Sequence, residues 1–225
     1  MARGYYVTGT DTAAGKTFAS VALIHALRAR GLRVAGMKPV ASGCELRNGA
    51  WRNEDAMALQ AASSDPVPDY ALVNPFALPE ATAPQIAAAH AGAMVNIAPM
   101  LAAYEALSAR ADAVVVEGVG GWLAPFADGF EQGELVARLQ LSVILVVGIK
   151  LGCLNHARLT ERRILDDGLR LAGWIGNRVD PALEHETEYV ELVTRSMASP
   201  CLGVLPHAGA LPPSRFAAHL RLSEG

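Results

Sequence analysis

The chain has 225 residues, of which 52% are hydrophobic and 18% charged, and its formal net charge is -3. This composition is typical of a folded globular chain with one sizeable core and excludes a disordered or fibrous protein. The slightly acidic balance provides no basic field, so we expect neither nucleic acid nor a membrane as a partner. Three separated cysteines without a CxxC pair indicate neither a disulfide framework nor a zinc site, and no targeting segment is visible, so we expect a cytoplasmic protein.

Short apolar runs alternate with longer amphipathic stretches along the chain. The runs predicted as buried strands are residues 5–7, 33–37, 113–116, 143–147 and 171–175. The stretches predicted as helices are residues 16–30, 55–62, 97–110, 154–167 and 184–198. The alternation predicts an α/β fold in a single domain, residues 1–225, with a mostly parallel twisted sheet and helices on both faces.

Residues 65–84 interrupt this alternation with five prolines. Because proline lacks a backbone N–H and clashes with the preceding helical turn, we expect neither a regular helix nor a central strand there. Long connections inside compact domains are usually functional or disordered, and no separate core follows this one. We therefore interpret the segment as a surface excursion of the domain and not as a linker.

The strongest motif is GTDTAAGKT, Gly9 to Thr17, directly after the first predicted strand and at the start of the first predicted helix. Small residues allow successive backbone N–H groups to surround a phosphate, Lys16 reaches the outer phosphates, and Thr17 offers a hydroxyl to magnesium. Five residues separate Gly9 from Gly15, whereas the common P-loop has four. The motif therefore predicts a variant P-loop that binds a nucleoside triphosphate.

Two acidic residues and a lysine are expected near this loop. Glu117 follows the strand at 113–116, at the edge of a parallel sheet where ligands bind, and its glycine-rich continuation forms either a turn or an anion-binding nest. Asp55 is a second candidate magnesium ligand or a simple helix cap. Lys38 follows the strand at 33–37 and either assists phosphoryl transfer or is solvated. Ser42 binds a substrate amine or caps a turn.

The motifs GTDTAAGKT, KPVASG, NEDA, VVVEGVGGW, VILVVGIKLGCLNHARLT and GWIGN together resemble the dethiobiotin synthetase family, over residues 6 to about 178. The stretch VNPFALPEATAPQIAA resembles the excursion of that family. The resemblance implies a homodimeric ligase of biotin synthesis with a P-loop, Rossmann-like sheet. Such an enzyme uses ATP, Mg²⁺ and CO2 to close the ureido ring of dethiobiotin on 7,8-diaminononanoate.

The resemblance also implies roles for individual residues. Lys16 and Lys38 would be catalytic, and Thr17, Asp55 and Glu117 would ligate magnesium. Further ATP contacts would come from Thr12, Ala13, Ala14, Gly15, Gly120, Asn177, Leu205, Pro206 and His207. The diamine would contact Lys38 and Ser42, and in the partner subunit's site the turn Gly152, Cys153, Leu154 and Asn155. Ala13 and His207 depart from the family pattern, and Ala208 to Gly225 carry no motif.

Two other functional classes remain open on the sequence. A nucleotide-switch ATPase of the partition or septum-site type shares a related sheet and loop, but positions 9–14 lack the second lysine of that class, and no basic amphipathic tail is present. Another ligase or a small-molecule kinase on the same scaffold would differ in its need for CO2. Cys44 and Cys153 are interpreted as packing residues and not as reactive thiols.

Overall fold

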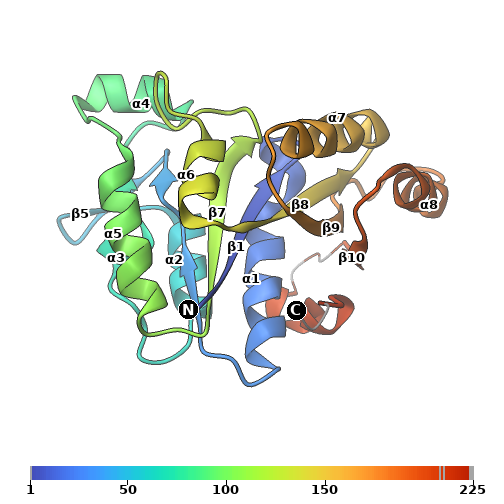
Figure 1. Cartoon of the computed structure of the whole chain (residues 1–225), viewed down its shortest axis with the longest axis horizontal. Coiled ribbons are helices and arrows are strands. Elements are labelled where there is room, and N and C mark those ends of the chain that lie inside the picture. The colour runs from blue at the N-terminus through green and yellow to red at the C-terminus, as the bar shows by residue number, and fades with distance from the viewer. Residues whose placement is uncertain (1, 208, 210, 223–225) are drawn as a thin grey trace.

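The computed structural model describes residues 2–207, 209 and 211–222. Six strands form one parallel sheet in the order β10-β9-β8-β1-β7-β2 (Figure 1). The strands are β1 (Arg3–Gly9), β2 (Val34–Met37), β7 (Ala113–Gly121), β8 (Ser142–Ile149), β9 (Leu171–Arg178) and β10 (Cys201–Leu205). The predicted α/β fold with a mostly parallel sheet is confirmed.

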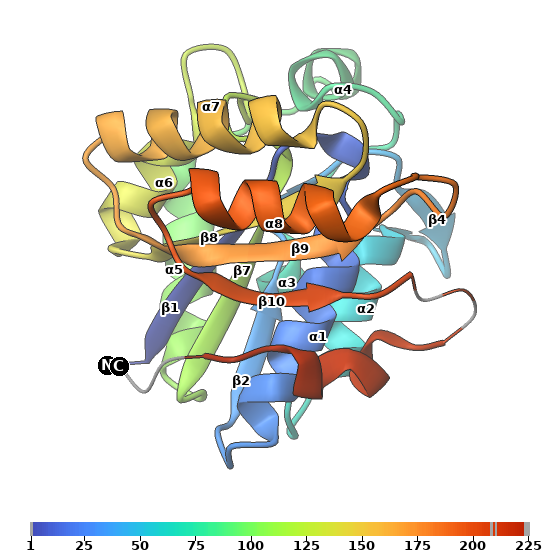
Figure 2. The ribbon, with the colours of Figure 1, turned by 90° about the vertical axis from the view of Figure 1, so that its right-hand side faces the viewer.

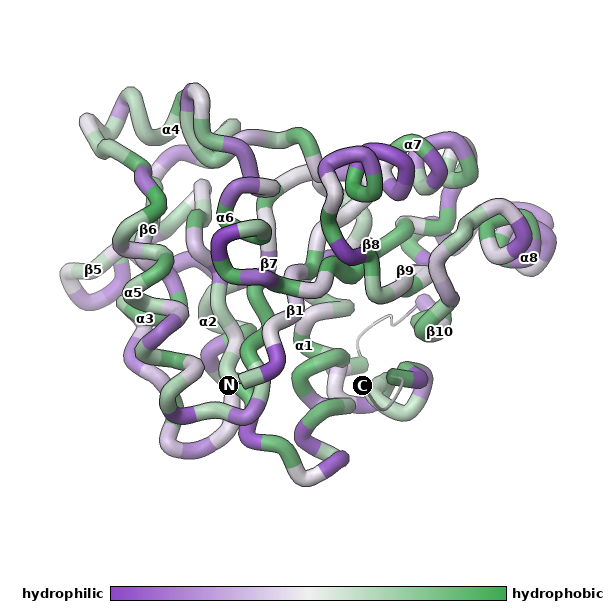
Figure 3. Tube along the Cα trace, viewed as in Figure 1, coloured by the Kyte–Doolittle hydropathy of each residue, from purple (hydrophilic) through white to green (hydrophobic). Residues whose placement is uncertain are grey.

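Helices cover both faces of this sheet (Figure 2). One face is covered by α1 (Lys16–Arg28), α2 (Glu54–Ala62) and the 3-10 segment η2 (Pro213–His219). The other is covered by α5 (Ile97–Ser108), α6 (Gln132–Leu139), α7 (Cys153–Asp166) and α8 (Glu186–Ser196). Strands β7 and β8 are mostly hydrophobic, whereas the outer helices α7 and α8 alternate hydrophobic and hydrophilic residues (Figure 3). Burial on both sides explains why the strands read as continuous apolar runs.

The central strand β1 lies between β7 and β8, and the strand order reverses there. From β1 the chain passes through α1 to β2 on one side, and from β8 it continues to β9 and β10 on the other. In open α/β sheets the ligand crevice lies outside the carboxyl ends of the strands at such a reversal. The loop after β1 therefore begins at the position where a ligand is expected.

The predicted elements correspond closely to those observed. Each of the five predicted helices has both ends within two residues of the observed helix. The edge strand β10 and the helix α6 were not predicted, because β10 is short with a central glycine and α6 spans just two turns. Among the described residues, no helix combines the length and apolar character that crossing a bilayer requires.

The strand β7 is longer than predicted. Val116 was expected to be its last residue, but it continues through Glu117 to Gly121, so Glu117 lies within the strand. Position 118 within this extension accepts glycine alone without rearrangement, because a Cβ there would lie 2.5 Å from the Tyr6 hydroxyl. The interpretation of these glycines as a separate turn is therefore wrong.

The proline-rich excursion holds more regular structure than predicted. One helical turn, α3 (Tyr70–Val73), lies between Pro68 and Pro75, so the expectation of no regular helix is wrong for that turn. The strand β6 (Phe76–Ala77) pairs with β3 (Val40–Ala41) in a separate two-stranded sheet. The last proline begins α4 (Pro84–Ala91), where a missing N–H leaves no helical hydrogen bond unmade.

Two further segments complete the fold. A hairpin of β4 (Glu45–Arg47) and β5 (Ala50–Arg52) precedes α2. Near the C-terminus, the η2 segment packs on α1, where the Phe216 and Phe18 rings lie 5.4 Å apart. Of the stretch from Ala208 to Gly225 that carries no motif, Ala208, Ala210 and residues 223–225 lie outside the described residues.

Candidate active site

The loop after β1 has the geometry of a phosphate cradle. Thr12–Ala14 form a single 3-10 turn, η1, and the Asp11 carboxylate accepts a hydrogen bond from the Ala13 N–H at 3.3 Å. Gly15 has φ of 80°, a left-handed conformation that favours glycine. The helix α1 begins at Lys16 without a side-chain cap, so its first N–H groups are available to an anion.

Lys16 folds back over this loop. Its ammonium donates hydrogen bonds to the carbonyl oxygens of Asp11 at 3.2 Å and Thr12 at 3.5 Å, and 6% of the residue is exposed. Burial, and repulsion from the Lys38 ammonium, lower the pKa of Lys16 to about 8, although nearby carboxylates oppose the shift. An anionic ligand bound beside the Lys16 ammonium would stabilise its charged form.

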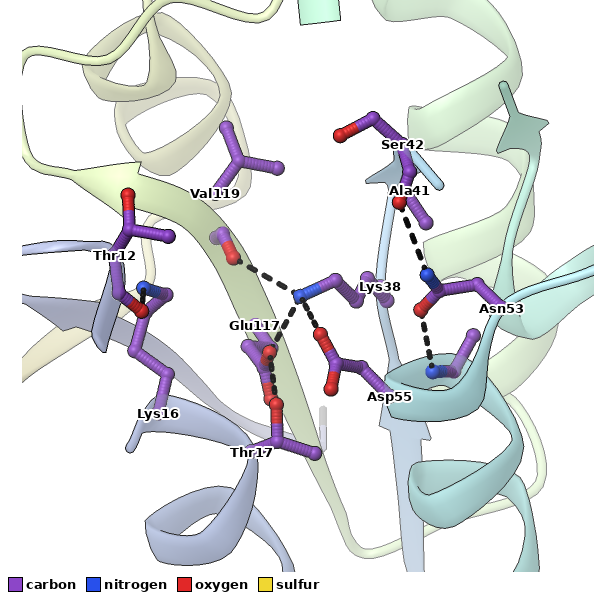
Figure 4. Close-up of polar contacts among 12 residues, drawn as sticks. Thr12, Lys16, Thr17, Lys38, Ala41, Ser42, Asn53, Asp55, Glu117 and Val119 are labelled. Atoms are coloured by element: carbon purple, nitrogen blue, oxygen red, sulfur yellow. Dashed lines mark hydrogen bonds and ion pairs between the residues drawn. The ribbon is translucent and has the colours of Figure 1, made fainter. Parts of the chain in front are cut away.

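Lys38, directly after β2, forms the centre of a charge cluster in which Lys38 and Glu117 are buried and Asp55 is partly exposed (Figure 4). Its Nζ lies 2.5 Å from Glu117 Oε1 and 3.1 Å from Asp55 Oδ2. The Thr17 hydroxyl donates to the same Glu117 oxygen at 2.9 Å. The elements α1, β2, α2 and β7 thus bring together four residues that are far apart in the sequence.

Electrostatics keeps this cluster charged. Burial disfavours the Lys38 ammonium, but Glu117 and Asp55 outweigh that cost and raise the pKa of Lys38 above its ordinary value. Burial likewise favours a neutral Asp55, yet Lys38 and a hydrogen bond from Thr17 lower the pKa of Asp55 below its ordinary value. Asp55 and Lys38 are therefore both ionised at neutral pH.

The oxygens of this cluster fit a magnesium ion. The second carboxylate oxygen of Glu117, Oε2, is buried without a hydrogen-bond partner, which indicates a position intended for a further cation. The described residues contain no group of three or more His, Cys, Asp or Glu side chains that would hold a metal alone. Two carboxylates and the Thr17 hydroxyl suit Mg²⁺, which completes its coordination with water and phosphate oxygens.

The structure also decides the local role of Asp55. The cap of α2 is Asn53, whose side chain accepts a hydrogen bond from the Ala56 N–H at 3.2 Å. The Asn53 amide also donates to the Ser42 carbonyl oxygen at 3.2 Å. Asp55 lies in the first helical turn with its carboxylate on Lys38, so the alternative interpretation of Asp55 as a simple cap is wrong.

Two adjoining cavities open at this cluster. The first, of about 470 Å³, is lined by Thr12, Ala13, Gly15, Lys16, Thr17, Lys38, Ser42, Asp55, Glu117, Val119 and Gly120. The second, of about 530 Å³, shares Thr12, Ser42, Val119 and Gly120 with the first and is also lined by Ala81–Gln85, Ala124 and Pro125. The sequence did not predict Val119 or Ala81–Gln85, because these residues carry no charged group and belong to no phosphate-binding motif.

Other predicted site residues lie at different distances from these cavities. The Asn177 amide donates to the Ala14 carbonyl oxygen at 3.0 Å and supports the loop from below. Leu205 is buried in the core beside it, and the His207 ring lies 3.3 Å from the Arg178 carbonyl oxygen. The Gly152–Asn155 turn opens α7 and lines neither cavity, whereas Asn155 lines a separate hollow of about 680 Å³ between α7 and α8.

An ion pair that the sequence did not predict joins the loop to the end of β8. The Lys150 ammonium contacts the Asp11 carboxylate, and this hydrogen bond lowers the pKa of Asp11. Lys150 follows β8 directly, at the same edge of the sheet as Lys38. A lysine at the end of a strand was the available signal, but the partner depends on the tertiary structure.

Comparisons with known proteins agree with this geometry. A family model described as an AAA domain matches residues 3–215. An ATP-dependent dethiobiotin synthetase of Xanthomonas campestris pv. campestris is 52% identical over 220 residues, which cover 98% of each chain. The chain belongs to the ATP-dependent dethiobiotin synthetase family. Another member, from Xylella fastidiosa, is 54% identical over 209 residues, covering 93% of this chain and 91% of its own. The family expected from the motifs is confirmed.

Solved structures at low identity share the fold of this dethiobiotin synthetase family member. The septum site-determining protein MinD of Pyrococcus horikoshii, complexed with Mg-ADP, has a TM-score of 0.55 at 16% identity, covering 96% of this chain and 89% of its own. A signal recognition particle protein of Aeropyrum pernix, in complex with GDP, has a TM-score of 0.55 at 17% identity. The match covers 96% of this chain and 45% of that protein. These likenesses show a common architecture.

The lowered pKa of Lys16 predicts a specific pH dependence of stability. Between the folded pKa of about 8 and the ordinary value of 10.5, the unfolded chain binds more protons at Lys16 than the folded protein does. The contribution of Lys16 to the free energy of unfolding therefore rises with pH in this window, by up to about 1.4 kcal/mol per pH unit. Urea unfolding of the wild type and of Lys16→Met, at about pH 7 and about pH 9.5, measures it. A stability difference that stays constant between these pH values contradicts the shift.

Proposed function

We propose that this chain is an ATP-dependent dethiobiotin synthetase that closes the ureido ring on 7,8-diaminononanoate with CO2, releasing ADP and phosphate in the cytoplasm. The observation that carries the proposal is the Lys38 ammonium held between Asp55 and Glu117, in a cavity that also contains the phosphate loop. A cation in this position would hold a carboxylated amine next to the terminal phosphate. Membership of the family supports the reaction.

The phosphate loop is proposed to hold the triphosphate of ATP. Backbone N–H groups of Thr12–Thr17 would surround the phosphates, with the Lys16 ammonium turned from Asp11 and Thr12 onto the outer phosphate. Asn177, beneath Ala14, would read the adenine edge with its amide, together with the backbone of Leu205–His207. The contact between Asn177 and the loop would couple recognition of the base to placement of the phosphates.

Magnesium is proposed to be held by Thr17, Asp55 and Glu117, which the buried Glu117 Oε2 without a partner supports. When bound, the ion would neutralise charge on the phosphate oxygens during transfer. Lys38 already forms ion pairs with both carboxylates. The same two carboxylates would therefore contact the lysine on one side and the metal ion on another. Glu117 and Asp55 therefore orient Lys38 as well as being the proposed ligands.

The chemistry assigned to Lys38 and Lys16 is electrostatic. One amine of the diamine adds to CO2 and gives a carbamate, whose oxygen then attacks the γ-phosphorus of ATP and displaces ADP. The second amine attacks the carbonyl carbon of this mixed anhydride, loses a proton and expels phosphate as the ring closes. Lys38 would hold the carbamate oxygens, Lys16 would stabilise the transferred phosphoryl group, and Ser42 would contact the amine end.

A homodimer is proposed to complete the diamine site. The Gly152–Asn155 turn opens α7 without a side-chain cap, which suits its helix N–H groups beyond Cys153 to a carboxylate, yet the turn lines neither cavity of its own chain. Three leucines exposed along this region support an interface: Leu151 is 77% exposed, Leu159 62% and Leu165 45%. An isologous contact would place each turn against the substrate of the partner subunit.

Phosphate release tests the proposed function. With ATP and magnesium, we expect release to require both the diamine and bicarbonate, and the product to have the mass of dethiobiotin. Lys38→Ala should lower turnover on the order of a hundredfold, because the charge that stabilises the transition state is lost. Circular dichroism checks that this variant is folded, since Glu117 loses the cation that pairs it. Release that needs neither diamine nor bicarbonate would favour a switch ATPase, and a phosphorylated product would favour a kinase.

The proposed metal ligands predict a shift in the magnesium requirement. Asp55→Asn should raise the magnesium concentration for half-maximal activity on the order of tenfold, because one ligand charge is removed. Asn53→Ala is a matched control on the same helix turn: it should cost about 0.5 to 2 kcal/mol of stability through loss of the cap and leave the magnesium curve in place. Identical magnesium curves for Asp55→Asn and the wild type would remove Asp55 from the ligand set.

The proposed shared site predicts complementation between subunits. Asn155→Asp should weaken diamine binding while ATP affinity stays nearly unchanged, because a negative charge would face the substrate carboxylate. Asn155→Ala should have a smaller effect, since it removes the amide without adding charge. Mixed and re-associated Lys38→Ala and Asn155→Asp chains should recover roughly a quarter of wild-type activity, because half of the dimers carry one intact site. Dimers that form without any recovered activity would contradict the shared site.

A further inference from the structure

Gln132, at the start of α6, has a side-chain amide that is fully buried and bonded on all sides. Its Oε1 accepts hydrogen bonds from the Tyr6 hydroxyl at 2.6 Å and from the Val119 N–H at 3.0 Å. Its Nε2 donates to the carbonyl oxygens of Val119 at 3.0 Å and Gly121 at 2.9 Å, and further contacts reach Trp122 and Ala124. Burying a primary amide is costly unless it is bonded in this way.

These bonds go to the end of β7 and the turn that follows it. The last residue pair between β2 and β7 is Met37 with Val116, so β7 continues to Gly121 without its neighbour on that edge. The Gln132 amide gives Val119 both a donor and an acceptor, as a neighbouring strand would. The side chain therefore stabilises a glycine-rich strand end that has few other means of holding its conformation.

This strand end forms one wall of the candidate active site. Val119 and Gly120 line both cavities, and Ala124 lines the second. The Gly118 carbonyl oxygen, in the same segment, lies 3.5 Å from Lys38 Nζ, and Glu117 lies next to it in the strand. A shift of the backbone at Val119 would displace the groups that orient Lys38.

Tyr6 connects this network to Glu117 from β1. Burial, together with the negative charge of Glu117, raises the pKa of Tyr6 well above its ordinary value, so the hydroxyl stays protonated and donates to Gln132. A Cβ on Gly118 would lie 2.2 Å from Gln132 Oε1 and 2.5 Å from the Tyr6 hydroxyl. Gln132 and Tyr6 therefore pack directly against the backbone between the carboxylate and Val119.

We propose that Gln132 is a positioning residue of this enzyme, which acts by holding residues 118–121 in register so that Lys38 and the wall at Val119 and Gly120 keep their places. The proposal rests on the proposed function of the site. Gln132 itself lines neither cavity and contacts no reacting group. Its effect on turnover is exerted through the backbone of β7.

The test compares Gln132→Met with a matched control. Methionine has similar length and no amide, so Val119 loses both hydrogen bonds to residue 132, whereas the Gly121 carbonyl oxygen keeps the Ala124 N–H at 3.0 Å. We expect kcat to fall about tenfold or more with smaller changes in KM, since misplaced groups matter most in the transition state. Tyr6→Phe removes the hydrogen bond from the Tyr6 hydroxyl to Gln132 and should give an intermediate loss of kcat. If Gln132→Met fails to fold, Tyr6→Phe tests the same role. Glu161→Gln weakens another buried polar network, at Ala198 and Ser199, and should keep wild-type kcat.

A second measurement does not depend on activity. Amide hydrogen exchange in residues 117–124 should be faster in Gln132→Met than in the wild type, and unchanged in Glu161→Gln. A kcat for Gln132→Met or for Tyr6→Phe within about twofold of the wild type, or an equal loss in Glu161→Gln, overturns the positioning role. A wild type without diamine-dependent phosphate release overturns the proposed function and this role with it, whereas an active wild type with a fully active Gln132→Met overturns the positioning role alone.

Discussion

The ion cluster of Lys38, Glu117 and Asp55 is the constraint on which the site depends. Glu117 is fully buried. An unpaired carboxylate at that depth would cost several kcal/mol, which is comparable with the free energy of unfolding of a whole domain. The cation that compensates it comes from the end of β2, and the hydroxyl that shares its oxygen comes from the first turn of α1. These contacts therefore fix the positions of β2, β7 and α1 relative to one another, at the edge of the sheet where a nucleotide would bind.

Around this cluster, several amide side chains bond to the backbone that shapes the site. Asn177 supports the phosphate loop at Ala14, Asn53 caps α2 and reaches the Ser42 carbonyl, and Gln132 bonds the end of β7. Each is a buried or partly buried amide, a group that can donate and accept at once. Loops made of small residues gain close approach to a ligand but lose rigidity. Amides placed behind them restore a defined conformation without filling the space in front.

The cavities extend the cluster toward the proline-rich excursion. Residues Ala81–Gln85 line the second cavity at the start of α4, while Val119 and Gly120 line both cavities. The turn at Gly152–Asn155 belongs to neither cavity, and the ion pair of Lys150 with Asp11 joins the segment before it to the phosphate loop. The end of β8 is thus connected to the phosphate-loop side of the site, whereas Gly152 and Asn155, in the turn that follows, are exposed.

The sequence by itself determined the elements and the chemistry that has a local signature. Apolar runs buried on both faces identified five of the six strands of the main sheet, and GTDTAAGKT identified the loop, because strand, cradle, lysine and helix are consecutive in the chain. Tertiary structure alone decided which charges meet: Asp55 and Glu117 are 62 positions apart in the numbering, and nothing local distinguishes a metal ligand from a helix cap. It also decided that β7 continues to Gly121, because that extension depends on Tyr6 and Gln132, contributed by distant segments. The fold determines which remote residues come into contact, and a short-range sequence pattern contains no information about those contacts.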